Sequence, residues 1–231
     1  MTNLLHSESN ATHGNLAIQH GESADVLQRT RTFLDTLGLS LSDCVLIECL
    51  HTEDITHVTR VDKAKTIPTE ALLTNEPGVV LFLLTGDCFP VSYHDPVLGV
   101  VGLAHLGWKP TDKKLAAKVV SEMVRMYESD PKNIKVHIGS GISVDSYVFA
   151  EAEQQGQSEW ADFVHDLPNG EVSVDLAGYI KQQLCDSGID PTNITQSSID
   201  TATSPERFSF YRSVRAGESQ ARFATVVTRV N

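Results

Sequence analysis

The chain has 231 residues and a formal net charge of −12. This acidic balance argues against nucleic acid or an anionic membrane as its partner, because both repel a negatively charged surface. No apolar run approaches the roughly 20 residues of a membrane span, and no signal peptide is visible at the N-terminus. We therefore expect a cytoplasmic protein with a substantial core and no obligate protein partner.

Apolar periodicity predicts helices and strands that alternate along the chain. In chain order, we expect a helix at 23–37, strands at 45–50 and 79–84, a hairpin at 91–101, a helix at 112–127, a strand at 134–138, a weaker helix at 151–163, a helix at 175–187, and closing strands at 194–196 and 223–230. Residues 1–14 are polar and rich in turn formers, so we expect a loose segment. Residues 15–231 are predicted to form one α/β (α+β) domain, a layered sandwich with a mixed β-sheet flanked by helices.

Cys88 and His105 flank the predicted hairpin. If its turn is formed by residues 95–98, His94 pairs with Gly99, and the same register places Cys88 opposite His105. Their Cβ atoms would then lie about 5 Å apart on one face of the sheet. This juxtaposition suits two ligands of one metal ion, or a thiol–imidazole pair.

His51 follows a predicted strand and adds a second imidazole. Two imidazoles and one thiolate form a three-ligand zinc set, which leaves a fourth position for water or substrate. Trp108 and Lys109 come shortly after His105 and would place a stacking plane and a cation beside the metal. The remaining cysteines flank or lie within apolar runs and are expected to be small buried side chains: Cys44, Cys49 and Cys185.

A central block of sequence resembles the laccase-domain family, also called the polyphenol oxidase or peptidoglycan editing factor family. The block comprises residues 73–79, 85–91 and 104–109. Weaker matches continue over most of the chain from about residue 14: Asn15-Leu16, His20-Gly21, Leu50-His51, Gly139-Ser140-Gly141-Ile142, Tyr147, Pro205-Glu206-Arg207-Phe208 and Tyr211-Arg212. The resemblance implies a single-domain α/β sandwich with one zinc ion, held by His51, Cys88 and His105.

The resemblance also implies an activity on purine nucleosides. Family members are described as catalysing phosphorolysis of adenosine, inosine and methylthioadenosine, and deamination of adenosine. Zinc can activate water for attack on the purine carbon that bears the amino group. Lys109 and Arg212 are candidates to bind the anionic oxygens of phosphate, and the Arg212 guanidinium suits a bidentate contact. Trp108 is a candidate to stack on the base.

The chain departs from the family pattern at several positions. A glutamine usual two residues before the first histidine is replaced by Cys49. The glycine usual after the tryptophan–basic pair is Pro110, which has no N–H to donate to an anion. We also expect the chain to be too short to hold the strand that family members place before the region of Asn15. These differences predict an intact metal set beside an altered substrate pocket.

Three other functions remain open from the sequence. A metal-independent cysteine hydrolase would use Cys88 as nucleophile and His105 as base, with Asp87 as the residue that orients the base. A non-catalytic metal-binding protein fits the altered pocket. A copper polyphenol oxidase fits the older family name, but laccase chemistry needs several copper ions and more histidines than converge here.

Overall fold

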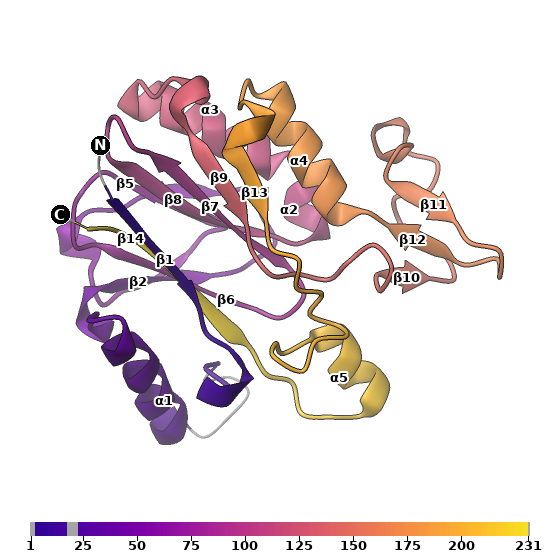
Figure 1. The fold of residues 1–231 in the computed structure, drawn as a ribbon, viewed down its shortest axis with the longest axis horizontal. Helices are drawn as coiled ribbons and strands as arrows, with labels where there is room; N and C mark the ends of the chain where they lie inside the picture. The colour runs from indigo at the N-terminus through magenta and orange to yellow at the C-terminus, as the bar shows by residue number, and fades with distance from the viewer. Residues whose placement is uncertain (1–2, 18–22, 231) are drawn as a thin grey trace.

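A computed structural model describes residues 3–17 and 23–230 of the chain. Two mixed β-sheets pack face to face, and helices cover the outer face of each sheet (Figure 1). This arrangement confirms the predicted α/β layered sandwich, with two large mixed sheets where one was expected. None of the described helices is long and apolar enough to cross a membrane.

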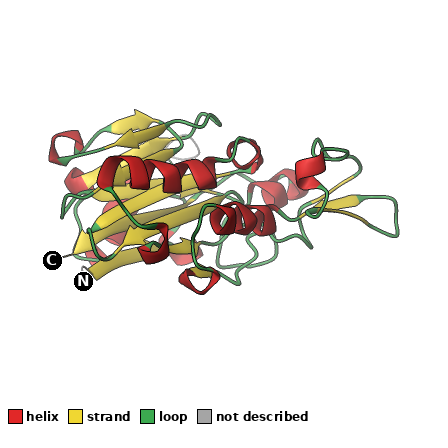
Figure 2. Ribbon diagram, turned by 90° about the horizontal axis from the view of Figure 1, so that it is seen from above, coloured by secondary structure: helices red, strands yellow, loops and turns green. Residues whose placement is uncertain are grey.

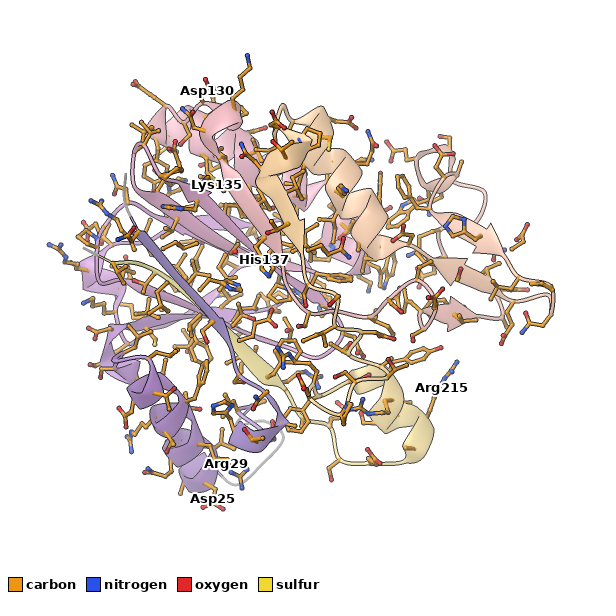
Figure 3. The ribbon with its side chains drawn as sticks, viewed as in Figure 1. Asp25, Arg29, Asp130, Lys135, His137 and Arg215 are labelled. Atoms are coloured by element: carbon orange, nitrogen blue, oxygen red, sulfur yellow. The ribbon has the colours of Figure 1, made fainter. Side chains whose placement is uncertain are left out.

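The first sheet has five strands in the order β1-β14-β6-β2-β4. Their bounds are β1 Asn3–Glu8, β2 Cys44–Glu48, β4 Thr66–Pro68, β6 Val80–Thr85 and β14 Phe223–Val230. Helix α1, Ser23–Thr36, covers its outer face, where Phe33 joins a buried cluster with Phe82. Asp25 and Arg29 lie on the exposed face of α1, directed away from the sheet (Figure 3).

Strand β1 replaces the loose N-terminal segment that the sequence predicted. It pairs antiparallel with β14 along its whole length, from Asn3 opposite Val230 to Glu8 opposite Thr225. Its side chains are at most partly buried, so the sequence lacks the strong apolar alternation of a core strand. The strand expected to be missing before Asn15 is therefore present. The His20-Gly21 match lies outside the described residues.

The second sheet has six strands in the order β13-β9-β7-β8-β5-β3. Their bounds are β3 Ile55–His57, β5 Ala71–Thr74, β7 Phe89–Asp95, β8 Val100–Leu106, β9 Lys135–Ile138 and β13 Ile194–Gln196. Helices α3, Leu115–Tyr127, and α4, Leu176–Asp186, lie side by side over its outer face (Figures 1 and 2). The short helix α2, Trp108–Asp112, precedes α3, and the two are separated at Lys114, whose backbone is left-handed with φ 63°.

A small third sheet projects beyond the two large ones (Figure 1). It contains β10 Val148–Phe149, β11 Val164–Asp166 and β12 Val172–Val174. The helix predicted at 151–163 is wrong, because these residues form turns and a 3-10 helix, Ser158–Trp160. Gly156, with φ 77°, adopts a backbone conformation incompatible with a continuous helix. Trp160 is fully buried, and its indole N–H donates to the Asp112 carboxylate at 2.8 Å.

Alternating side chains divide the core into layers. In β8, Val101 and Leu103 belong to the cluster between the two sheets, whereas Val100 and Ala104 belong to the cluster beneath α3 and α4. This is the two-residue period expected of a strand buried on both faces. Position along a strand therefore decides whether a side chain points between the sheets or toward the helices.

Leu103→Ala is expected to lower the free energy of unfolding by about 2–5 kcal/mol, because it leaves a cavity between the sheets. Chemical denaturation followed by circular dichroism measures the change. Val61→Ala is the matched control: Val61 is 78% exposed, and its truncation should alter the free energy by less than about 0.5 kcal/mol. Equal effects of the two substitutions would contradict the assignment of Leu103 to the core.

Candidate functional site

Polar and sulfur-containing side chains lie where the apolar core between the two sheets ends. His105 is two residues beyond Leu103 on β8, and Glu70 is two residues before Leu72, which belongs to the same cluster. Cys49 is two residues beyond Ile47, next to the end of β2. The period of two residues directs all three toward the space between the sheets.

Glu70 and His105 form a buried pair at the centre of the site. The Glu70 Oε2 atom lies 2.6 Å from His105 Nδ1, and the relative exposure is 0% for Glu70 and 4% for His105. The His105 backbone N–H also donates to the Glu70 carbonyl at 2.8 Å. The carboxylate therefore fixes the imidazole orientation and leaves Nε2 as the ring nitrogen available to another partner.

The second oxygen of Glu70 holds the loop that carries Cys49 and His51. Glu70 Oε1 accepts hydrogen bonds from the backbone N–H groups of Leu50, at 2.6 Å, and Thr52, at 3.2 Å. Burial opposes ionisation of Glu70, but its hydrogen bonds and the His105 charge outweigh burial and lower the pKa of the carboxyl. Glu70 was not predicted as a site residue, since nothing in its neighbourhood in the sequence marks it as buried.

The register of the β7–β8 hairpin differs by two residues from the predicted one. Pro90, and not Cys88, lies opposite His105, and Asp95 pairs with Val100, so the turn is formed by residues 96–99. The turn shifts because Asp95 Oδ1 accepts from the backbone N–H groups of residues 97 and 98. A two-residue shift preserves the face of the sheet to which each side chain points.

Cys88 still lies near His105 despite this shift, in the segment just before β7. The thiols of both Cys88 and Cys49 are close enough to the His105 ring to act on its charge. Burial alone would lower the pKa of His105, but the two thiols outweigh it and raise the pKa above its usual value. Cys49 was expected to be a buried apolar side chain, and the structure instead places it at the site.

The candidate ligands differ in how closely they approach. Among the described residues, Cys49, Glu70 and His105 form the group whose ligand atoms all lie within 4.8 Å of one another. The predicted set of His51, Cys88 and His105 does not meet that spacing, although its members are neighbours. The His51 and His105 ring centroids are 5.4 Å apart, in an edge-to-face arrangement.

His51 has an unusual backbone and a neutral side chain. Its φ of 59° lies in the left-handed region, which a non-glycine residue seldom adopts and which is often found at functional sites. Burial and the neighbouring His105 both lower the pKa of His51. The imidazole is therefore neutral at neutral pH, which is the form that binds metals.

A cavity of about 210 Å³ opens beside these residues. Its lining includes His51, Cys88, Trp108, Lys109 and Tyr147. Lys109 is an exposed residue, and its Nζ atom lies 5.5 Å from the centroid of the Trp108 ring. The predicted ligands His51 and Cys88 thus share one cavity with the predicted stacking and anion-binding residues.

Two backbone features shape the wall around Cys88. Asp87 has φ 94°, and its carboxylate accepts from the Thr201 hydroxyl and the Tyr211 backbone N–H, each at 2.6 Å. A Cβ atom at Gly107 would lie 2.8 Å from Cys88 Sγ, a contact that is too short for any side chain. Gly107 therefore allows the close approach of the thiol to the end of β8.

Arg212 lies away from this cavity. Arg212 lies in the first turn of helix α5, Phe210–Ala216. Its guanidinium donates to four backbone carbonyls, those of Thr201, Ala202, Ser204 and Arg207. It lines a separate cavity with Tyr211 and Arg215. These bonds hold the loop before α5 together and leave Arg212 poorly placed to bind an anion beside Cys88. Helix α5 itself was not predicted.

Arg222 is a second cation near the thiols that sequence analysis did not identify. Burial lowers the pKa of its guanidinium, while the nearby Cys88, Asp87 and Cys49 favour the charged form. It directly precedes β14, with one N–H donated to the Ala221 carbonyl. In the sequence, Arg222 is marked only as a basic residue at the start of an apolar strand. Surface residues commonly have this pattern, so it does not indicate a site.

Residues 5–229 match the family described as multi-copper polyphenol oxidoreductase laccase. The chain belongs to this family. The match spans both sheets, from β1 to β14, and confirms the resemblance seen in the sequence. Several relatives of this chain carry purine nucleoside activities in their names.

Two relatives illustrate this. "Purine nucleoside phosphorylase YlmD" of Bacillus subtilis is 28% identical over 212 residues, covering 84% of this chain and 74% of that protein. "Adenosine deaminase RL5", from an unknown prokaryotic organism, is 28% identical over 217 residues, covering 88% of this chain and 82% of that protein. Among solved structures, the hypothetical protein YfiH of Bacillus licheniformis superposes with a TM-score of 0.81 at 27% identity, covering 93% of this chain and 85% of that chain.

Glu70→Ala should lower the free energy of unfolding by about 3–5 kcal/mol, because it leaves a buried imidazole and two loop N–H groups without their acceptor. Denaturant titration of the metal-free protein measures this change. Glu151→Ala, which removes an exposed carboxylate, is the matched control and should have little effect. A loss below about 1 kcal/mol for Glu70→Ala would contradict the role of Glu70 as the link between the loop and β8.

Proposed function

We propose that this laccase-family chain is a zinc-dependent purine nucleoside enzyme. The reactions proposed are phosphorolysis of adenosine, inosine or methylthioadenosine and deamination of adenosine. The observation that carries the proposal is the buried Glu70–His105 pair, which presents one ring nitrogen of His105 toward two thiols beside a cavity. The names of the relatives supply the substrate class.

The residues present fit a zinc ion. Thiolate and imidazole are the ligands that zinc prefers, and a metal-binding histidine usually donates its other ring N–H to a carboxylate. Cys88, His105 and His51 would hold the ion, with Glu70 fixing the His105 tautomer. When bound, zinc supplies a Lewis acid and lowers the pKa of a coordinated water.

The histidine content of the site favours zinc over multi-copper chemistry. Among the histidines that the structure describes, His51 and His105 are the two whose rings meet at this site. Several copper ions, as the family description suggests, would require a larger set of imidazoles. We therefore keep copper as the alternative metal and do not propose phenol oxidation.

The cavity residues supply binding and orientation. Trp108 offers an aromatic face for a purine base, and the exposed Lys109 ammonium is placed to bind phosphate beside it. Arg212 is not assigned this role, because its guanidinium is bonded to backbone carbonyls. Both substrates would thus meet within one cavity that also holds His51 and Cys88.

A second candidate function rests on the same contacts. Cys88, His105 and Glu70 match the nucleophile, base and orienting residue of a metal-independent cysteine hydrolase. Glu70 takes the place of Asp87 in that scheme, since both Asp87 carboxylate oxygens accept other hydrogen bonds. Alkylation of Cys88 separates the two: slowing by added zinc favours the metal enzyme, and a rapid alkylation that added zinc leaves unchanged favours the nucleophile.

His105→Ala should abolish both zinc binding and turnover of inosine, adenosine and methylthioadenosine. Zinc content is measured by elemental analysis, and turnover is followed with and without phosphate to separate phosphorolysis from deamination. His165→Ala, which truncates an exposed histidine outside the site, is expected to keep both. Full activity in a metal-free preparation would refute the proposal.

Lys109→Ala should raise the KM for phosphate by about tenfold or more, since a charge-assisted hydrogen bond is worth about 1.5–3 kcal/mol. Steady-state phosphorolysis at varied phosphate concentration measures this. The exposed Lys181 on α4 provides the control variant Lys181→Ala, which should keep the wild-type KM. An unchanged KM in Lys109→Ala would remove Lys109 from the phosphate site.

A further inference from the structure

Cys49 approaches the site from a different side than Cys88 does. Cys88 and His51 are among the residues that line the cavity, whereas Cys49 packs against the apolar cluster between the two sheets. Its Sγ nevertheless lies within 4.8 Å of the ligand atoms of both His105 and Glu70. Two thiols therefore converge on one imidazole, one from the cavity and one from the core.

We propose that Cys49 is a second thiolate ligand at this site, so that the metal is held by Cys49, Cys88, His105 and His51. This inference rests on the proposed function, because it assumes that the site binds zinc. Thiolate and imidazole are both preferred zinc ligands, and zinc can expand from four to five ligands during turnover, so the water or substrate of the proposed reaction would enter as a fifth ligand.

The fold holds Cys49 in this position from both sides. Val45 and Ile47, which precede Cys49 along the chain, are buried between the sheets. The two-residue period of a strand points the Cys49 side chain into the same space. After Cys49, the N–H groups of Leu50 and Thr52 are bonded to Glu70, the carboxylate that also orients His105. One side chain thus fixes both the imidazole and the loop that brings the second thiol to it.

A second thiolate would change the charge of the loaded site. Zinc with one thiolate and two imidazoles carries a net charge of about +1, and with two thiolates it is close to neutral. A neutral centre attracts an anion less strongly. The cations around the cavity, Lys109 on one side and Arg222 near both thiols, would then contribute most of the attraction for phosphate.

Cobalt(II) substitution counts the thiolates directly. Each Co–S bond adds ligand-to-metal charge-transfer absorption in the near ultraviolet, so the intensity per bound cobalt scales with the number of thiolate ligands. We expect Cys49→Ser and Cys88→Ser each to reduce this intensity by about half. Cys185→Ser, which changes a partly exposed cysteine on α4, is the control and should leave the spectrum unchanged.

The outcomes separate this inference from the proposed function. If the wild-type protein binds one cobalt and Cys49→Ser leaves the intensity unchanged while Cys88→Ser abolishes it, Cys49 is not a ligand and the proposed zinc enzyme stands. If the wild-type protein binds no cobalt or zinc, both proposals are wrong.

A measurement on the unmutated chain guards against misfolding of the variants. Iodoacetamide labelling of the wild-type protein, followed by peptide mass spectrometry, should be slowed by zinc at Cys49 and Cys88 and unaffected at Cys185. An unchanged labelling rate at Cys49 in the presence of zinc would overturn the inference.

Discussion

The carboxylate of Glu70 is the interaction on which the site depends. It precedes β5 in the second sheet, contacts His105 on β8 of that sheet, and accepts two N–H groups from the loop that follows β2 of the first sheet. A single buried side chain therefore joins the two sheets at the point where their apolar core ends. Such a group is stable only when each of its oxygens finds hydrogen-bond donors, and Glu70 meets this condition with two donors on Oε1 and one on Oε2.

The surrounding residues extend this polar end of the core into a cavity. The two residues with left-handed backbones near it, His51 and Asp87, lie in the connections that follow β2 and β6. Asp87 is fixed by Thr201 and the Tyr211 N–H, so distant parts of the chain meet at Cys88. The rigid sheets thus position the loops that carry the chemistry, which is the usual division of labour in folded domains.

The sequence predicted the fold class and most central elements because their apolar patterns are local. It also brought Cys88 and His105 together, since a register error of two residues does not change the face of a strand. Local patterns could not reveal Glu70, whose partner His105 is 35 residues away, or show that Cys49, which packs against the core, also reaches the site. The resemblance led to Arg212 as an anion-binding candidate, and the four carbonyls that occupy its guanidinium become known only once the loop before α5 is folded.

The placement of the two tryptophans gives the chain separate optical reporters. Trp160 is fully buried against Tyr179 and bonded to Asp112, whereas Trp108 is partly exposed at the wall of the cavity. The chain contains no other tryptophan. The blue-shifted part of the intrinsic fluorescence therefore reports on the integrity of the core, and the red-shifted part reports on occupation of the cavity.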